Sequence, residues 1–182
     1  MKNFIPSFGA VVLAIVPLAS IAENPRAAAS AEKQLWSFSE RIALALPGDG
    51  RDVLKIASVS SDSVATPLGL EHRGVHKEIA PSLVVSNIVV VTTSDNHADS
   101  VSFDVTESCI PLASLRNQYP SLIVMDYARA DSEHATYTLG AQVGDAIVAY
   151  SFPANRLNCM SRVAVTPAKV TKSKLGIGNQ KK

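Results

Sequence analysis

Two histidines, His72 and His76, stand four residues apart and are flanked by two glutamates. On a helix this spacing places both imidazoles on one face, which is the arrangement that zinc sites use. Arg73 stands where a His-Glu-x-x-His metalloprotease has its general base, and the glycine and valine that follow it disfavour a helix. The segment is therefore interpreted as a solvated loop, and the sequence predicts no metal site and no cofactor.

The other two histidines lie in polar segments that are typical of turns. His97 stands between Asp95 and Asp99, and His134 follows a glutamate. Short polar side chains favour turns because they form hydrogen bonds with nearby backbone groups. Both histidines are therefore interpreted as turn residues.

The chain has none of the short motifs that mark common enzyme mechanisms. There is no Gly-x-Ser-x-Gly elbow for a nucleophilic serine and no Walker loop for phosphates. No catalytic residue is therefore assigned. A small envelope hydrolase stays open as an alternative, because catalytic residues can be dispersed along a chain. Its candidate side chains are His72, His76, Asp126 and His134.

Cys109 and Cys159 are the two cysteines of the chain. Their spacing is unlike the Cys-x-x-Cys of a redox centre, and an even pair in an exported chain favours a structural disulfide. The sequence therefore predicts a disulfide that closes a loop of about fifty residues, worth roughly 4 kcal/mol in the chain-entropy treatment.

A protein-binding face is suggested at the end of a predicted strand over residues 122–128. Side chains alternate between the two faces of a strand, so either Asp126 or Tyr127 points outward. Tyr and Arg are enriched among the residues that dominate binding energy at protein interfaces. The hypothesis is a partner-binding face made of Tyr127, Arg129 and His134; the alternative is an ordinary strand surface.

The first 22 residues have the three parts of a secretory signal peptide. Lys2 gives a short positive start, an apolar block runs over residues 10–16, and the small residues Ser20 and Ala22 precede a cleavage position. The apolar run is shorter than the roughly 20 residues that a membrane-spanning helix needs. We expect cleavage near Ala22, a periplasmic or secreted mature chain that begins near Glu23, and no transmembrane segment after cleavage.

Charge is unevenly divided along the chain. The whole sequence has 17 basic and 16 acidic residues. Residues 23–168 hold 11 basic and 16 acidic residues, whereas residues 169–182 hold five lysines and no acid. An acidic body opposes nucleic-acid binding, which depends on neutralising phosphates, and favours a basic protein partner. The lysine-rich end over 167–182 is predicted to be disordered.

The hydrophobic pattern predicts a single globular domain over residues 23–166. The predicted helix covers 24–46, where apolar residues recur at helical spacing before a Pro-Gly turn. Its core stripe is Leu35, Phe38, Ile42 and Leu46. A strand is predicted over 53–59, followed by a long connection over 66–79.

The second half of the chain predicts strands joined by tight turns, which make an antiparallel sheet. A short helix is predicted over 111–119, between two strands. The resulting class is α+β: a mainly antiparallel sheet with an N-terminal helix, a short helix between strands and one disulfide. The predicted strands cover residues 83–93, 101–105, 122–128, 136–142, 146–152 and 162–166.

Export, small size, an acidic body and the lack of a catalytic motif together favour a non-enzymatic protein-binding domain. Inhibitors, and immunity proteins that neutralise a toxin or an envelope hydrolase, belong to this class. The alternatives are the small hydrolase and an envelope-associated module whose lysine-rich end touches an anionic surface.

Overall fold

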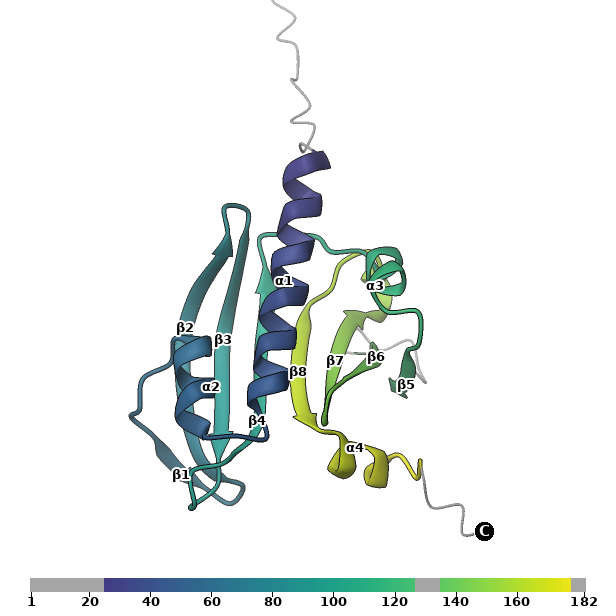
Figure 1. The fold of residues 1–182 in the computed structure, drawn as a ribbon. Coiled ribbons are helices and arrows are strands. Elements are labelled where there is room, and N and C mark those ends of the chain that lie inside the picture. The colour runs from purple at the N-terminus through teal and green to yellow at the C-terminus, as the bar shows by residue number, and fades with distance from the viewer. Residues whose placement is uncertain (1–24, 127–134, 178–182) are drawn as a thin grey trace, which may run out of the picture.

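A long helix, α1 (Pro25–Ala45), lies across the middle of an antiparallel sheet (Figure 1). The computed structural model describes residues 25–126 and 135–177. Leu35 and Ile42 of the predicted helical stripe are fully buried against the sheet, and Phe38 and Leu46 are at most 4% exposed. The stripe therefore anchors α1, as its spacing predicts.

The strands of the described residues form one eight-stranded sheet in which each half is a meander. The order is β1-β2-β3-β4-β8-β7-β6-β5, and all neighbours pair antiparallel. The last strands of the two halves, β4 and β8, therefore meet in the middle. The strands are β1 (Val64–Thr66), β2 (Gly69–Ala80), β3 (Leu83–Thr92), β4 (Ala98–Thr106), β5 (Ile123–Asp126), β6 (Thr136–Val143), β7 (Ala146–Pro153) and β8 (Arg162–Pro167).

The connection between the halves carries the chain from the middle of the sheet to its far edge. It contains the short helix α3 (Leu112–Gln118) and begins beside the disulfide. The chain then returns strand by strand to β8, which follows a single 3-10 turn, η1 (Ala154–Arg156). The predicted α+β class, with an N-terminal helix and a short helix between strands, is confirmed.

The core lies between α1 and both halves of the sheet. Phe38 of α1 packs on Phe103 of β4 with ring centroids 5.4 Å apart, and Trp36 meets Tyr150 of β7 edge to face at the same separation. Phe103 and Tyr150 are fully buried. Because α1 spans the junction between β4 and β8, its burial holds the two meanders together.

The strand predicted over 53–59 is wrong, because this segment is a helix, α2 (Gly50–Ala57). Asp49 caps its first turn by accepting a bond of 2.8 Å from the backbone N–H of Arg51, and Ser58 ends it in the left-handed conformation. Val53 and Ala57 are both fully buried. A spacing of four puts two residues on one face of a helix and also on one face of a strand, so the pattern alone was ambiguous.

The long connection predicted over 66–79 is also wrong, because most of it is β2. This strand pairs with β3 along most of its length, but β1 covers its outer side only at residues 69–71. A strand that is open on one side keeps many exposed side chains, so it lacks a clean apolar alternation. Pairing with the strongly apolar β3 determines its conformation.

Part of the end that was predicted to be disordered is helical. α4 (Ala168–Lys174) follows β8 and buries Ala168 and Thr171. Residues 178–182 lie outside the described residues, as does the signal segment 1–22. No helix within 25–126 or 135–177 is long and apolar enough to span a membrane.

Candidate protein-docking surface

An apolar strip lies on the helix-bearing side of the second meander. Leu44 of α1 is 65% exposed and Val124 of β5 is 51% exposed. Half-buried apolar side chains beside them pack against the core. The strip is made of Leu44, Leu122, Val124, Tyr137 and Val143.

Strand register places these residues on one side. Val124 pairs directly with Leu139, so both point to the same face of the sheet. Leu139 is only 3% exposed and belongs to the core under α1. Tyr137 and Val143 share its face because side chains two and four residues apart in a strand point the same way.

Leu44 lies at the other end of the strip, against the turn between β6 and β7. A Cβ atom built on Gly144 would lie 3.4 Å from Leu44 Cδ2. Val124 lies beside Leu139 of β6, and Leu139 is four residues from Val143. The strip is therefore roughly 14 Å long between Val124 and Val143. Leu139 and Ala141, which share this face of β6 between Tyr137 and Val143, are buried, so the exposed apolar groups Leu44 and Val124 lie toward the two ends of the strip.

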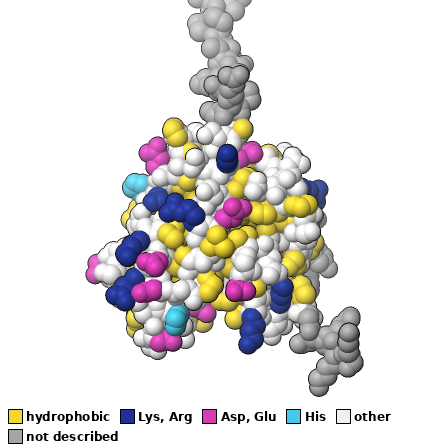
Figure 2. Space-filling view, viewed as in Figure 1, with side chains coloured by type: hydrophobic (Ala, Val, Ile, Leu, Met, Phe, Trp, Pro, Cys, Tyr) yellow, Lys and Arg dark blue, Asp and Glu magenta, His cyan; other side chains and the backbone are white. Residues whose placement is uncertain are grey.

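The strip is open because the second meander lacks a counterpart of α2. In the first meander α2 lies over β2 and β3, whereas α3 lies at the end of the second meander (Figure 1). Within the described residues, no helix lies over β5 and the outer part of β6. Figure 2 shows hydrophobic side chains gathered on this face, to the right of α1, with acidic side chains next to them.

A polar cluster borders the strip where α1, α3 and β7 meet. The hydroxyl of Tyr150 donates to that of Tyr119 at 3.1 Å, and Tyr119 donates to Glu40 Oε1 at 2.8 Å. The Trp36 ring contacts both phenol rings edge to face. Each side chain is fixed by the next, so the carboxylate of Glu40 is held in one place.

Burial disfavours ionisation of both phenols of this cluster. It raises the pKa of Tyr119 above its ordinary value, and the neighbouring Glu40 carboxylate raises it further. Burial likewise raises the pKa of Tyr150 well above the ordinary value. Neither group is poised to act as a base, and both serve as hydrogen-bond donors.

Two carboxylates border the strip. Glu40 lies on α1 and Asp145 lies in the turn after Val143, whereas Asp126 pairs with Thr138, whose side chain points to the other face of the sheet from Leu139. The side chains of Asp126 and Asp145 are exposed. The rim is therefore acidic, although Lys169 of α4 lines a hollow together with Asp145 at its lower end.

The partner-binding residues named from the sequence, Tyr127, Arg129 and His134, lie outside the described residues. Asp126, their neighbour in the chain, is exposed at the end of β5. The strip itself was missed by sequence reasoning, because Leu44 and Val124 are eighty residues apart and only the strand register brings their surroundings together.

The histidines that carried the metal hypothesis lie on β2, and not in a loop. His72 is buried, with Nε2 3.1 Å from Thr92 Oγ1, and no partner for Nδ1 lies among the described residues. His76 is exposed. Among the residues that the structure describes, no three His, Cys, Asp or Glu side chains are grouped to hold a metal ion.

His97 lies in the turn between β3 and β4, where it joins this turn to the corner between α1 and α2. Its Nδ1 lies 3.1 Å from the carbonyl oxygen of Gly48, and its Nε2 lies 3.8 Å from Asp95. Asn96 donates to Asp49 at 2.9 Å in the same corner. These contacts show that His97 helps to hold the turn in place, as its interpretation as a turn residue predicts.

The dispersed hydrolase site named from the sequence does not assemble within the described residues. His72 and His76 lie on β2, and Asp126 lies on β5 at the opposite edge of the sheet. Six strand spacings separate β2 from β5, or roughly 29 Å. His134 lies outside the described residues.

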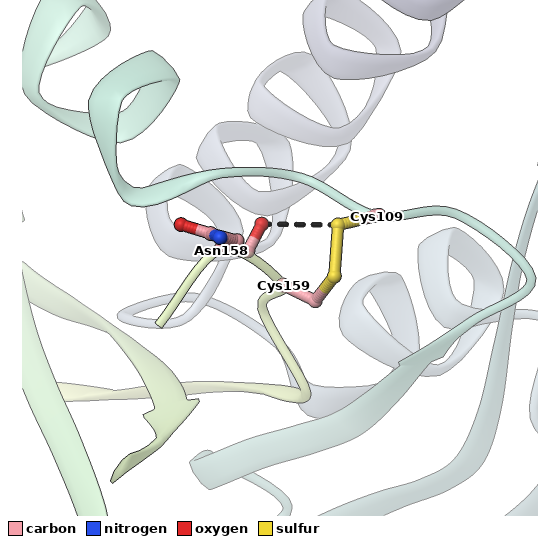
Figure 3. Close-up of a disulfide and its surroundings, with 3 residues drawn as sticks. All are labelled: Cys109, Asn158 and Cys159. Carbon is pink, nitrogen blue, oxygen red and sulfur yellow. Dashed lines mark hydrogen bonds between the residues drawn. A yellow bond between two sulfur atoms is a disulfide. The ribbon is translucent and has the colours of Figure 1, made fainter. Parts of the chain in front are cut away.

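The predicted disulfide is confirmed. Cys109 and Cys159 are joined and close a loop with a sequence separation of 50 residues. Figure 3 shows the bridge between two connecting segments, where Cys109 Sγ lies 3.0 Å from the carbonyl oxygen of Asn158. Next to it the backbone of Met160 donates to the carbonyl of Ile110 at 2.9 Å. The bridge therefore ties the segment before α3 to the segment before β8.

Searches against protein-family models, curated proteins and solved structures found no match to this chain.

Proposed function

We propose that this chain is an exported domain that binds another protein, in the manner of an inhibitor or an immunity protein. The signal-like segment over 1–22 and a two-cysteine mature sequence support a periplasmic or secreted location. The target is a toxin or an envelope hydrolase that this domain keeps inactive.

The observation that carries the proposal is the apolar strip with Leu44 and Val124 exposed at 65% and 51%. Exposed apolar side chains with a polar border occur at protein interfaces. Tyr137 lies among them, and tyrosine is frequent among the residues that dominate binding energy. The strip lies on regular elements that the core holds in place, so little ordering is required when a partner binds.

The partner should present a basic surface around an apolar segment. Asp145 is exposed beside the strip, and Glu40 is fixed there by its bond to Tyr119. The sequence of the body has more acidic than basic residues over 23–168. Such charges steer a basic partner toward the strip and select against acidic competitors.

The test is affinity capture with the mature chain, residues 23–182, produced in an oxidising compartment and immobilised. Envelope and secreted fractions of the source organism are passed over wild type and over a Leu44→Ser/Val124→Ser variant. We expect wild type to retain one stoichiometric basic protein and the variant to lose it by about a hundredfold in Kd, since two central contacts of an interface are removed.

The matched control is Val64→Ser/Val75→Ser, which removes two apolar side chains at the other edge of the sheet that are more exposed than Leu44 and Val124, at 67% and 80%. This control should retain the same protein. Equal capture by all three baits, or capture that fails only in the control, would contradict docking on the strip.

A further inference from the structure

The outer face of α4 combines lysines with exposed apolar side chains. The inner face holds the helix on the domain: Thr171 Oγ1 lies 2.7 Å from Thr166 Oγ1, and Lys172 Nζ donates to Gln142 Oε1 at 2.7 Å. Ala168 is also buried. Residues 168, 171 and 172 share one side of a helix, so the opposite side is turned away from the sheet.

That outer face presents two charges and two apolar groups. Lys169 and Lys174 are exposed, Val170 is 42% exposed and Ile177 is 43% exposed. Val170 and Lys174 are separated by four residues and so lie on one face of α4, and Ile177 follows just beyond the end of the helix. No acidic residue occurs from 169 to the end of the sequence.

The end of the helix fixes the position of Ile177. Gly176 adopts a φ of 69°, its N–H donates to the carbonyl of Ser173 at 3.2 Å, and the N–H of Ile177 donates to the carbonyl of Lys172 at 2.9 Å. This pair of bonds is the Schellman motif, in which glycine takes the left-handed conformation at low cost. The backbone of Ile177 is therefore fixed at the end of α4.

We propose that this face docks on the surface of an anionic lipid bilayer. Lysines near an anionic leaflet are attracted to it, and apolar side chains on the same face gain by entering the interface between headgroups and acyl chains. A soluble polyanion offers no place for Val170 and Ile177, so a bilayer fits this face better. The inference is independent of the protein-binding proposal.

Docking through α4 sets the orientation of the domain. The N–H of Ala168 donates to the carbonyl of Asp145 at 2.8 Å, so α4 is fixed to the turn between β6 and β7. α3 lies at the other end of the sheet (Figure 1). The bilayer would therefore meet the end of the sheet near α4, and α3 would point away from it.

The test is co-sedimentation of the mature chain with vesicles of phosphatidylglycerol mixed equally with phosphatidylcholine, and with vesicles of phosphatidylcholine alone. We expect binding to the mixed vesicles that is at least about tenfold tighter than to the neutral ones and weakens with added salt. Lys169→Gln/Lys174→Gln should weaken it roughly thirtyfold, and Val170→Ser/Ile177→Ser roughly tenfold.

Lys33→Gln/Lys55→Gln is the control, because it removes two exposed lysines from α1 and α2 and so matches the change in net charge. It should bind within about threefold of wild type. Unchanged binding by the α4 lysine variant would overturn the proposal. So would full binding by the Val170→Ser/Ile177→Ser variant, because a charge contact alone would then suffice. Circular dichroism checks that each variant is folded.

Discussion

The hydroxyl of Tyr119 donates a hydrogen bond of 2.8 Å to Oε1 of Glu40 and so joins the end of α3 to the C-terminal half of α1. Tyr150 of β7 extends the contact by donating to Tyr119 at 3.1 Å. Three separate elements are thereby fixed at the border of the apolar strip. The contact supports the account of the strip as a preformed surface.

Replacing Tyr119 by Phe should lower the free energy of unfolding by about 2 kcal/mol, because the Tyr150 hydroxyl loses its acceptor and Glu40 loses a donor. Urea unfolding with the disulfide intact measures the change. Tyr137→Phe is the matched control, since its hydroxyl forms no hydrogen bond with another side chain or backbone group among the described residues. It should change the value by less than about 0.5 kcal/mol. Equal effects of the two substitutions would show that the chain of bonds contributes nothing.

The phenols of Tyr119 and Tyr150 should make the free energy of unfolding fall at alkaline pH. Burial raises the pKa of Tyr119 and of Tyr150 above the ordinary value of 10.0. The folded state then keeps protons that the unfolded chain releases. The stabilisation is complete below about pH 10 and is lost as pH rises toward the folded-state pKa values.

Phenolate absorbance and denaturant unfolding measured from neutral to alkaline pH test this dependence. The free energy of unfolding should fall as pH rises above about 10, and the fall should be shallower in Tyr150→Phe. A stability that is flat across this range, or phenolate formation by all four tyrosines without unfolding, would contradict the burial of these groups.

Removing the disulfide should lower the free energy of unfolding by roughly 4 kcal/mol, because the unfolded chain regains the freedom of a loop of 50 residues. Cys109→Ser/Cys159→Ser is compared with wild type in urea, with and without a reducing agent. The reducing agent should shift the midpoint of wild type to that of the variant and leave the variant unchanged. A wild-type urea midpoint that stays unchanged after complete reduction would show that the disulfide does not stabilise the fold.

Gly50→Ala should destabilise the corner between α1 and α2 by about 1–3 kcal/mol, because an added Cβ has no room. It would lie 2.8 Å from the carbonyl oxygen of Asn96 and 3.0 Å from Thr92 Cγ2. The control is Gly48→Ala, whose added Cβ would lie 3.3 Å from the carbonyl oxygen of Ala45. Urea midpoints should fall further for Gly50→Ala than for Gly48→Ala; the reverse order would contradict the packing of this corner.

Sequence reasoning succeeded where one element carries a strong periodic signal. The stripe from Leu35 to Leu46 is long enough to establish a helix, β3 is a run of β-branched apolar residues, and β4 alternates clearly. The disulfide followed from an even pair of cysteines in a chain whose sequence predicts export. In each case local pattern and tertiary environment agree.

Sequence reasoning failed where tertiary contacts determine the conformation of a segment. α2 is eight residues long and its identity depends on the Asp49 cap and on burial against the sheet. β2 has an open outer side and exposed charges, so it resembles a loop. The apolar strip depends on the pairing of Val124 with Leu139, a register that no local pattern in either segment encodes.

The most direct test of the docking surface is amide hydrogen exchange of the mature chain, free and bound to the protein that it captures. We expect new protection over 42–46, 122–126 and 137–145, and none over β1 or the open side of β2. Protection that is confined to β1 and β2, with unchanged exchange around Leu44 and Val124, would contradict docking on the strip.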